Sequence, residues 1–132
     1  MYQKTLLTGS ILVVLSNPYT VNAASLVLTT VNNTDDYSSV YITHRGCAPK
    51  STAPHSRLDT PLALAKTICL KTSGFCEATL YPSNNCSGTP QAVLQMDLSN
   101  AHVTITQRLD NKYVITAENT ESGSIVTVGY SS

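Results

Sequence analysis

Hydrophobic and polar residues alternate along most of the chain. In Ser38–His44, Val40 and Ile42 fall on one face and Tyr41 falls on the other. This two-residue period, with many Val, Ile, Thr and Tyr residues, is typical of half-buried β-strands. The runs that share it are Ser25–Val31, Ser38–His44, Glu77–Tyr81, Gln91–Leu98, His102–Leu109, Lys112–Glu118 and Ser124–Tyr130.

Turn-forming residues separate these runs. Two of the separations, Leu109–Lys112 and Thr120–Ser124, are short enough for β-hairpins. From Glu77 onward the pattern predicts an antiparallel meander of about five strands. Because each strand has one apolar face, the strands must pair these faces or close on themselves. We therefore predict an all-β domain, an antiparallel β-sandwich or a small barrel of about seven or eight strands.

The segment Leu58–Lys71 fits two structures. Thr60 before Pro61 can start a helix, with a capping side chain and a proline in the first turn. A helix would place Leu62, Ala65 and Cys69 on one face, whereas a strand would align Leu62, Leu64, Ile68 and Leu70. In a chain that is otherwise rich in strands, we prefer the strand.

The amino-terminal residues match a secretory signal peptide. Lys4 precedes an apolar run, Leu6–Leu15, and Val21–Ala23 suits cleavage by signal peptidase. The apolar run is too short to span a bilayer, which takes about 20 residues. We predict a signal peptide at residues 1–23 and one secreted domain, extracellular or periplasmic, at residues 24–132.

The charge balance after cleavage is close to neutral. Loss of Lys4 leaves seven basic and eight acidic side chains. This lacks the basic surface of a nucleic-acid-binding protein, and no later segment is apolar enough to span a membrane. We predict neither a nucleic-acid partner nor a membrane span, and no cofactor.

All four cysteines follow the predicted cleavage site. An even number of cysteines in an exported chain favours two disulfides. No two cysteines have the spacing of two intervening residues that zinc sites use. Cys86 has no neighbouring His, Lys or Arg that would activate a thiol. We interpret Cys86 as one end of a cross-link that holds its turn-rich loop, Tyr81–Pro90.

The pairing of the cysteines depends on the ambiguous segment. If Leu62–Lys71 is a strand that forms a hairpin with the next strand, Cys69 and Cys76 lie at the same hairpin end. Cys76 and Cys86 would then lie at opposite ends of an extended strand, beyond the roughly 7 Å that a disulfide allows between α-carbons. This favours Cys69–Cys76 and Cys47–Cys86. If Thr60–Lys71 is a helix, this reasoning no longer holds, and Cys47–Cys69 with Cys76–Cys86 becomes a possible pairing.

No standard catalytic motif is present. A small hydrolase would use His44 and His55 with Asp59, but such residues are more often solvated loop and strand-end residues. Asp35 and Asp36 are a weak candidate calcium site, because calcium takes oxygen ligands. We favour an Asx-type turn there, in which Asp and Asn side chains bond to their own backbone.

The longest irregular stretch is His44–Pro61, which holds three prolines and is anchored by Cys47. Loops of this length are usually functional or disordered. We predict a binding surface for an unknown protein or glycan, formed by this loop and the Tyr81–Pro90 loop. Its candidate residues are Arg45, Lys50, His55, Arg57, Tyr81, Asn84 and Asn85. The alternative is a protease inhibitor that inserts Lys50 or Arg57 into its target, and a small hydrolase ranks third.

Leu80–Gly88 (LYPSNNCSG) resembles the corner of the βγ-crystallin Greek-key motif, with Tyr81 and Gly88 at the matching positions. Asp35–Val40 (DDYSSV) resembles a shortened form of the calcium signature of that family. Cys86 stands where the second aromatic residue belongs, and DDYSSV precedes the corner instead of following it. The resemblance is confined to these residues and implies only an all-β fold.

Overall fold

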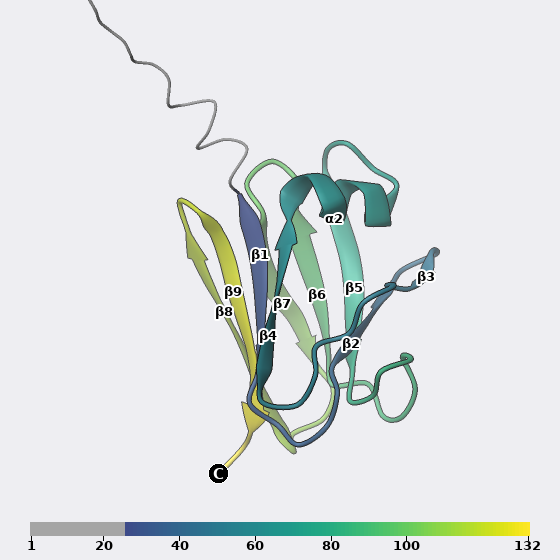
Figure 1. The fold of residues 1–132 in the computed structure, drawn as a ribbon, viewed down its shortest axis with the longest axis vertical. Coiled ribbons are helices and arrows are strands. Elements are labelled where there is room, and N and C mark those ends of the chain that lie inside the picture. Colours follow the sequence, from purple (N-terminus) through teal and green to yellow (C-terminus); the bar gives the residue numbers. More distant parts are fainter. Residues whose placement is uncertain (1–25) are drawn as a thin grey trace, which may run out of the picture.

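Each alternating run of the sequence forms a strand in the computed structural model, which describes residues 26–132 (Figure 1). The first sheet has the order β4 (Ser56–Pro61), β1 (Val27–Asn32), β9 (Gly123–Tyr130) and β8 (Tyr113–Thr120). The second has the order β3 (Gly46–Cys47), β2 (Ser39–Ile42), β5 (Phe75–Tyr81), β6 (Ala92–Asp97) and β7 (His102–Arg108). The prediction of an all-β, sandwich-like domain is confirmed. The predicted signal peptide lies outside the described residues.

The core lies between the two sheets. Alternate residues of β6, namely Ala92, Leu94 and Met96, are buried, as the two-residue period requires. In the first sheet, Ile115 pairs with Val128 and both side chains are almost fully buried. These apolar faces form one hydrophobic cluster, as expected when two half-buried sheets pack together.

The first and last strands, β1 and β9, pair in parallel in the middle of the first sheet, so the two ends of the described chain lie at opposite ends of that sheet (Figure 1). This pairing requires Gly123, which has φ +127°. A Cβ atom at Gly123 would lie 1.9 Å from the carbonyl oxygen of Val27. Glycine is therefore the residue that permits this close approach of the two backbones.

The predicted five-strand meander is wrong after β7. Strands β5, β6 and β7 are antiparallel neighbours, but the chain then crosses to the other sheet. Leu109–Lys112 is therefore a crossing between sheets and not a hairpin, and the amides of Leu109 and Asp110 donate to Gln91 O. Thr120–Ser124 does form the predicted hairpin, in which Thr120 pairs with Gly123. A short polar turn does not by itself say which sheet the next strand joins.

The preferred strand at residues 62–71 is also wrong, because this segment contains the helix α2 (Leu62–Cys69). Pro61 stands at the position before the helix, where its missing N–H is not needed. Leu62, Ala65 and Cys69 are buried, which is the helical face that the sequence offered. The helix ends at Leu70, whose φ of 54° is left-handed.

The long irregular segment His44–Pro61 is shorter than predicted. Gly46–Cys47 forms β3, and Ser56–Pro61 forms β4, the edge strand beside β1. Within the remaining segment, Thr52 pairs with Ser38 through two backbone hydrogen bonds of 2.8 and 2.9 Å. Among residues 26–132, no helix is long and apolar enough to cross a membrane.

Candidate functional site

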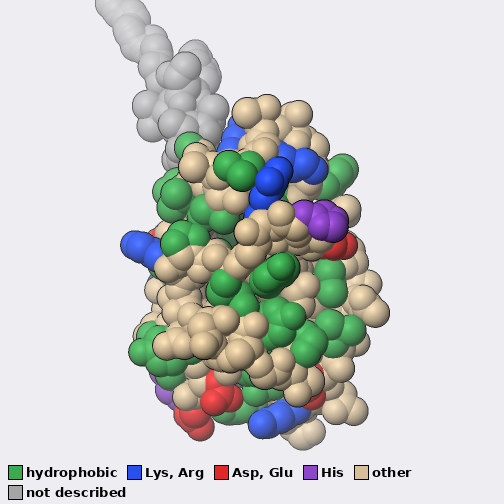
Figure 2. Space-filling model, turned by 90° about the vertical axis from the view of Figure 1, so that its right-hand side faces the viewer, with side chains coloured by type: hydrophobic (Ala, Val, Ile, Leu, Met, Phe, Trp, Pro, Cys, Tyr) green, Lys and Arg blue, Asp and Glu red, His purple; other side chains and the backbone are tan. Residues whose placement is uncertain are grey.

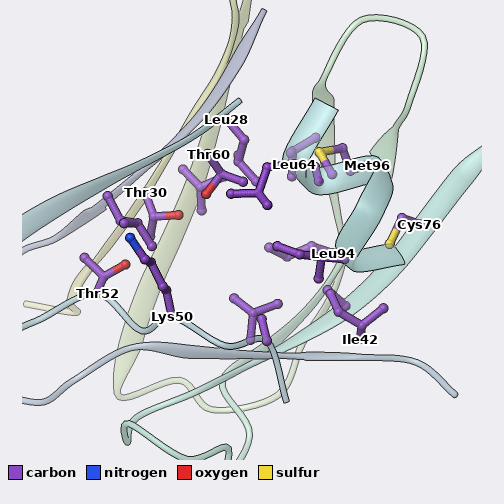
Figure 3. A pocket seen from close by; sticks show the side chains of 18 of the residues that line it. Leu28, Thr30, Ile42, Lys50, Thr52, Thr60, Leu64, Cys76, Leu94 and Met96 are labelled. Carbon is purple, nitrogen blue, oxygen red and sulfur yellow. The ribbon is translucent and has the colours of Figure 1, made fainter. Parts of the chain in front are cut away.

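A cleft of about 260 Å³ opens between the two sheets on the side where β4 faces β2 (Figure 3). The first sheet contributes Leu28, Thr30, Leu58 and Thr60; the second contributes Val40, Ile42, Ala78, Leu94 and Met96. Helix α2 adds Leu64, Ala65 and Ile68, and the chain after β3 adds residues 48–50 and Thr52. Most of these side chains are apolar, so the cleft is an open part of the hydrophobic core.

Connections between segments of the chain lie at both ends of the cleft. At one end, α2 lies across the ends of β4 and β5, and Cys69 is linked to Cys76 of β5 (Figure 1). At the other end, the Asn32 side-chain amide donates to the carbonyl oxygens of Thr52 and Ala53, both at 3.2 Å. The first connection joins the two sheets, and the second ties β1 to the segment between β3 and β4.

Polar groups gather on one side of the cleft. Figure 3 shows the amino group of Lys50 on the same side as the hydroxyls of Thr30 and Thr52, away from Leu94 and Met96. Ser38 also lines the cleft and is 3% exposed, yet its Oγ has no hydrogen-bond partner in the described part of the chain. Buried hydroxyls are usually hydrogen-bonded, so this one is a candidate contact for a ligand.

The two charged side chains that line the cleft, Asp59 and Lys50, differ in whether they already have partners. Asp59 accepts hydrogen bonds from Thr29 at 2.9 Å and from Arg57 at 3.2 Å. The Thr29 hydrogen bond, followed by that of Arg57, holds the pKa of Asp59 below its ordinary value. Lys50, by contrast, forms no salt bridge with any residue in the range 26–132. Among residues 26–132, Lys50 is therefore the cationic side chain of the cleft lining that is available to meet a ligand.

The predicted binding residues are spread over the molecule. Lys50 lines the cleft, whereas Arg45 lies in the turn between β2 and β3. Arg57 belongs to the edge strand β4 and not to a protruding loop of the kind an inhibitor displays. His55 Nε2 lies 2.6 Å from Asp35 Oδ1. The other three residues, Tyr81, Asn84 and Asn85, lie at the end of β5 and in the loop that follows it.

Both disulfides that the sequence argument favoured are present. Cys47 pairs with Cys86 at a Cα–Cα distance of 5.8 Å, and Cys69 pairs with Cys76 at 6.1 Å. The argument for Cys69–Cys76 assumed a hairpin of two strands, but the bond joins the last residue of α2 to β5. The left-handed Leu70 turns the chain back, so a helix end meets the strand just as a hairpin would. Cys86 is one end of a cross-link, as predicted from its position in the turn-rich Tyr81–Pro90 loop.

The hydrolase and calcium candidates have other partners. Asp59 accepts hydrogen bonds from Thr29 and Arg57, not from either histidine, and His44 lies in a turn with φ 66°. Asn32 Oδ1 accepts hydrogen bonds from the amide and hydroxyl of Thr34, which is the Asx-type turn favoured from the sequence. Asp36 Oδ2 accepts a hydrogen bond of 3.2 Å from Tyr113. In residues 26–132, no three His, Cys, Asp or Glu side chains are grouped so that they could hold a metal ion.

Most of the residues that line the cleft were not predicted from the sequence. Leu28, Val40 and Ile42 occupy alternating apolar positions that are indistinguishable from ordinary core positions. One signal was available, because Thr30 and Thr60 are polar residues on the inner, apolar faces of their strands. A hydroxyl on an inner face indicates that the opposite sheet does not press against it.

Comparison with known proteins places the chain in a family. The family model described as the T2SS substrate NttC, where T2SS is the type II secretion system, matches residues 3–127. The chain belongs to the NttC family. As a member of this family of secretion substrates it is a secreted protein, as the sequence predicted. No significant match was found among curated proteins.

The fold is also shared with a solved member of this family. The crystal structure of the Legionella pneumophila type II secretion system substrate NttC superposes with a TM-score of 0.66 and 22% sequence identity. The match covers 80% of this chain and 97% of that chain. At this identity the similarity supports the shared fold, and the chemistry of the cleft must be argued from the residues of this chain.

Proposed function

We propose that this secreted NttC-family protein acts by binding and not by catalysis, and that it holds a small molecule with an apolar body in the cleft between its sheets. The supporting observation is the cleft itself, whose lining is mostly aliphatic. Ligand sites in proteins are typically concave, mostly apolar and equipped with a few polar groups, and this cleft has each of these properties.

The size of the cleft limits the ligand. Its volume of about 260 Å³ exceeds the roughly 150 Å³ of an engineered cavity that binds benzene. It lies near the lower end of the range for drug-sized ligands, roughly 300–1,000 Å³. A single aliphatic chain or a small ring system fits this range. Each buried methylene would contribute about 0.8 kcal/mol, so a chain of medium length is enough for measurable binding.

The cleft supports binding because its walls are already in place. The segment at residues 48–50 and Thr52 follows Cys47, which is linked to Cys86. Helix α2 is tied to β5 by the second disulfide. A ligand therefore does not have to order these segments on binding, which lowers the entropic cost. This moves the proposed binding surface from the tips of the two predicted loops to the cleft beside the first of them.

The test is a titration of the secreted protein with N-phenyl-1-naphthylamine, an uncharged dye that fluoresces in apolar sites. Val40→Phe places a larger side chain in the cleft, and Ile125→Phe makes a similar change on the exposed face of β9. We expect Val40→Phe to weaken dye binding by about tenfold or more, because it removes the volume that the dye occupies. Ile125→Phe should leave binding within about twofold of the unmodified protein. Equal dye binding by a folded Val40→Phe protein would refute the proposed site.

A further inference from the structure

We infer that the ligand of the cleft is a single-chain carboxylic acid, whose carboxylate is recognised by Lys50 and whose aliphatic chain lies among the core residues. This inference rests on the proposed function and narrows it from any apolar molecule to one chemical class. The polar and apolar parts of the cleft are segregated, and a segregated site fits an amphiphile.

Lys50 supplies the charge. Its amino group lies with the hydroxyls of Thr30 and Thr52 on one side of the cleft, as Figure 3 shows. Within residues 26–132 no carboxylate pairs with Lys50, while the nearby Asp59 is already engaged by Arg57 and Thr29. A ligand carboxylate would therefore meet an available ammonium group. Hydrogen bonds of this charged kind are roughly twice as strong as neutral ones.

Ser38 and Thr52 supply hydroxyls beside it. The two residues face each other in an antiparallel bridge, so their side chains project from the same side of the chain pair. Both are 3% exposed, and the Oγ of Ser38 has no hydrogen-bond partner within residues 26–132. A carboxylate has two oxygens and accepts several hydrogen bonds, which matches an ammonium group together with hydroxyl donors. A hydrocarbon ligand would leave the Ser38 hydroxyl unsatisfied.

The surface near the cleft also favours an anion. On the face shown in Figure 2, hydrophobic side chains lie across the middle, and several Lys and Arg side chains lie toward the end that carries α2, while others lie at the left edge and at the opposite end beside Asp and Glu. Lys66 lies in α2, and Lys71 follows it. Neither lysine pairs with a carboxylate in the described part of the chain. Positive potential around an opening raises the local concentration of anionic ligands.

The experiment compares decanoate with 1-decanol, which has the same chain length but no charge. Both are titrated against the dye-loaded protein at pH 8, and displacement gives the two affinities. We expect decanoate to bind about tenfold more tightly than decanol, the ratio that corresponds to one charged hydrogen bond. Lys50→Met, which keeps the length of the side chain, should abolish this preference and leave decanol binding within about twofold.

Two further variants test whether the preference for decanoate comes from the residues that line the cleft. Lys112→Met removes a lysine that lies over the Tyr113 ring and does not line the cleft, so it should keep the preference for decanoate. Ser38→Ala should weaken decanoate binding by about threefold without unfolding the protein, since its hydroxyl makes no hydrogen bond with any of the residues that the structure describes.

The outcomes separate the two proposals. Two results would refute the inference that the ligand is a carboxylic acid: equal affinities of decanoate and decanol in dye displacement, or a preference for decanoate that persists in Lys50→Met. Either result would leave the proposed apolar binding site in place. If neither amphiphile nor the dye binds, the proposed function fails as well.

Discussion

One long side of the sandwich is closed and the other is open. On one side, β7 and β8 belong to different sheets but are joined by polar side chains. The Asn119 side chain accepts from the amide of Val103 at 2.8 Å and donates to its carbonyl at 3.0 Å, and Arg108 donates to Ile115 O at 3.0 Å. On the other side, β4 and β2 leave the cleft between them. There, both disulfides lie near the opening.

This difference shows how a sandwich can keep an open core without collapsing. Side chains that reach across the gap satisfy backbone groups of the opposite sheet and bring the strands together. A cleft that must stay open cannot use such bridges along its length. Covalent links at α2 and at β3 hold the segments around the opening and leave its lining free. We therefore expect hydrogen bonds to stabilise the closed side of the sandwich and disulfides to stabilise the open side.

The largest expected effect comes from the open side. Replacing both Cys47 and Cys86 by Ala opens a loop with a sequence separation of 39, which should lower the free energy of unfolding by about 4 kcal/mol. The matched change at Cys69 and Cys76, with a separation of 7, should lower it by about 2 kcal/mol. Urea unfolding of the two double variants measures both values. A smaller loss for the longer loop would show that local strain or packing dominates over chain entropy.

On the closed side, Asn119→Ala should lower the free energy of unfolding by about 2 kcal/mol. It leaves the amide and carbonyl of the buried Val103 without their partners, and a buried unsatisfied group costs about 1–3 kcal/mol. Asn111→Ala is the control, because Asn111 is exposed and uses only its backbone carbonyl, which accepts from Ser131. Similar stability of the two variants would mean that the Asn119 bridge does not hold the sheets together.

Ser38 and Ser39, which are neighbours at the open side, should contribute differently to the free energy of unfolding. Ser39→Ala should lower the free energy of unfolding by about 1–2 kcal/mol, because Ser39 Oγ accepts the amide of Cys86 at 2.9 Å. Ser38→Ala should change it by less than about 0.5 kcal/mol, or raise it, since Ser38 Oγ has no partner. Thermal unfolding of the ligand-free protein compares the pair. A large loss at Ser38 alone would contradict the interpretation of its hydroxyl as a ligand contact.

The smallest effect at neutral pH concerns Tyr113, at the start of β8. Burial, followed by the hydrogen bond to Asp36, raises the pKa of Tyr113 from 10.0 to about 12. Because the folded state keeps its proton longer than the unfolded state, the stability from this group is complete below pH 10 and is lost as the pH rises to about 12.

Tyr113→Phe tests this dependence, because phenylalanine cannot ionise. Urea midpoints measured between pH 10 and 12 should fall less steeply for Tyr113→Phe than for the unmodified protein. Tyr37→Phe, at an exposed tyrosine, should keep the original slope. Identical slopes for all three proteins would exclude Tyr113 as the group responsible.

The sequence by itself determined every strand except β3 and β4, the class of fold and the export of the chain. Alternation is a local property, because successive side chains of a strand point to opposite faces, so Val40 and Ile42 reveal a strand without any knowledge of its partner. The disulfide pairing could also be predicted from the sequence, since the length of chain between two cysteines limits which sulfurs can meet. Even so, the Cys69–Cys76 pair was predicted from a hairpin of two strands, whereas Cys69 ends a helix.

The tertiary structure alone decided which strands share a sheet, that residues 62–69 form a helix, and where the core is open. Each of these depends on contacts between residues far apart in the chain: β1 lies beside β9, and Leu28 faces Met96 across a gap. An apolar side chain on an inner face has the same local pattern whether or not the opposite sheet touches it. The cleft could therefore not be derived from periodicity, because an opening in a core is a property of two surfaces and not of one strand.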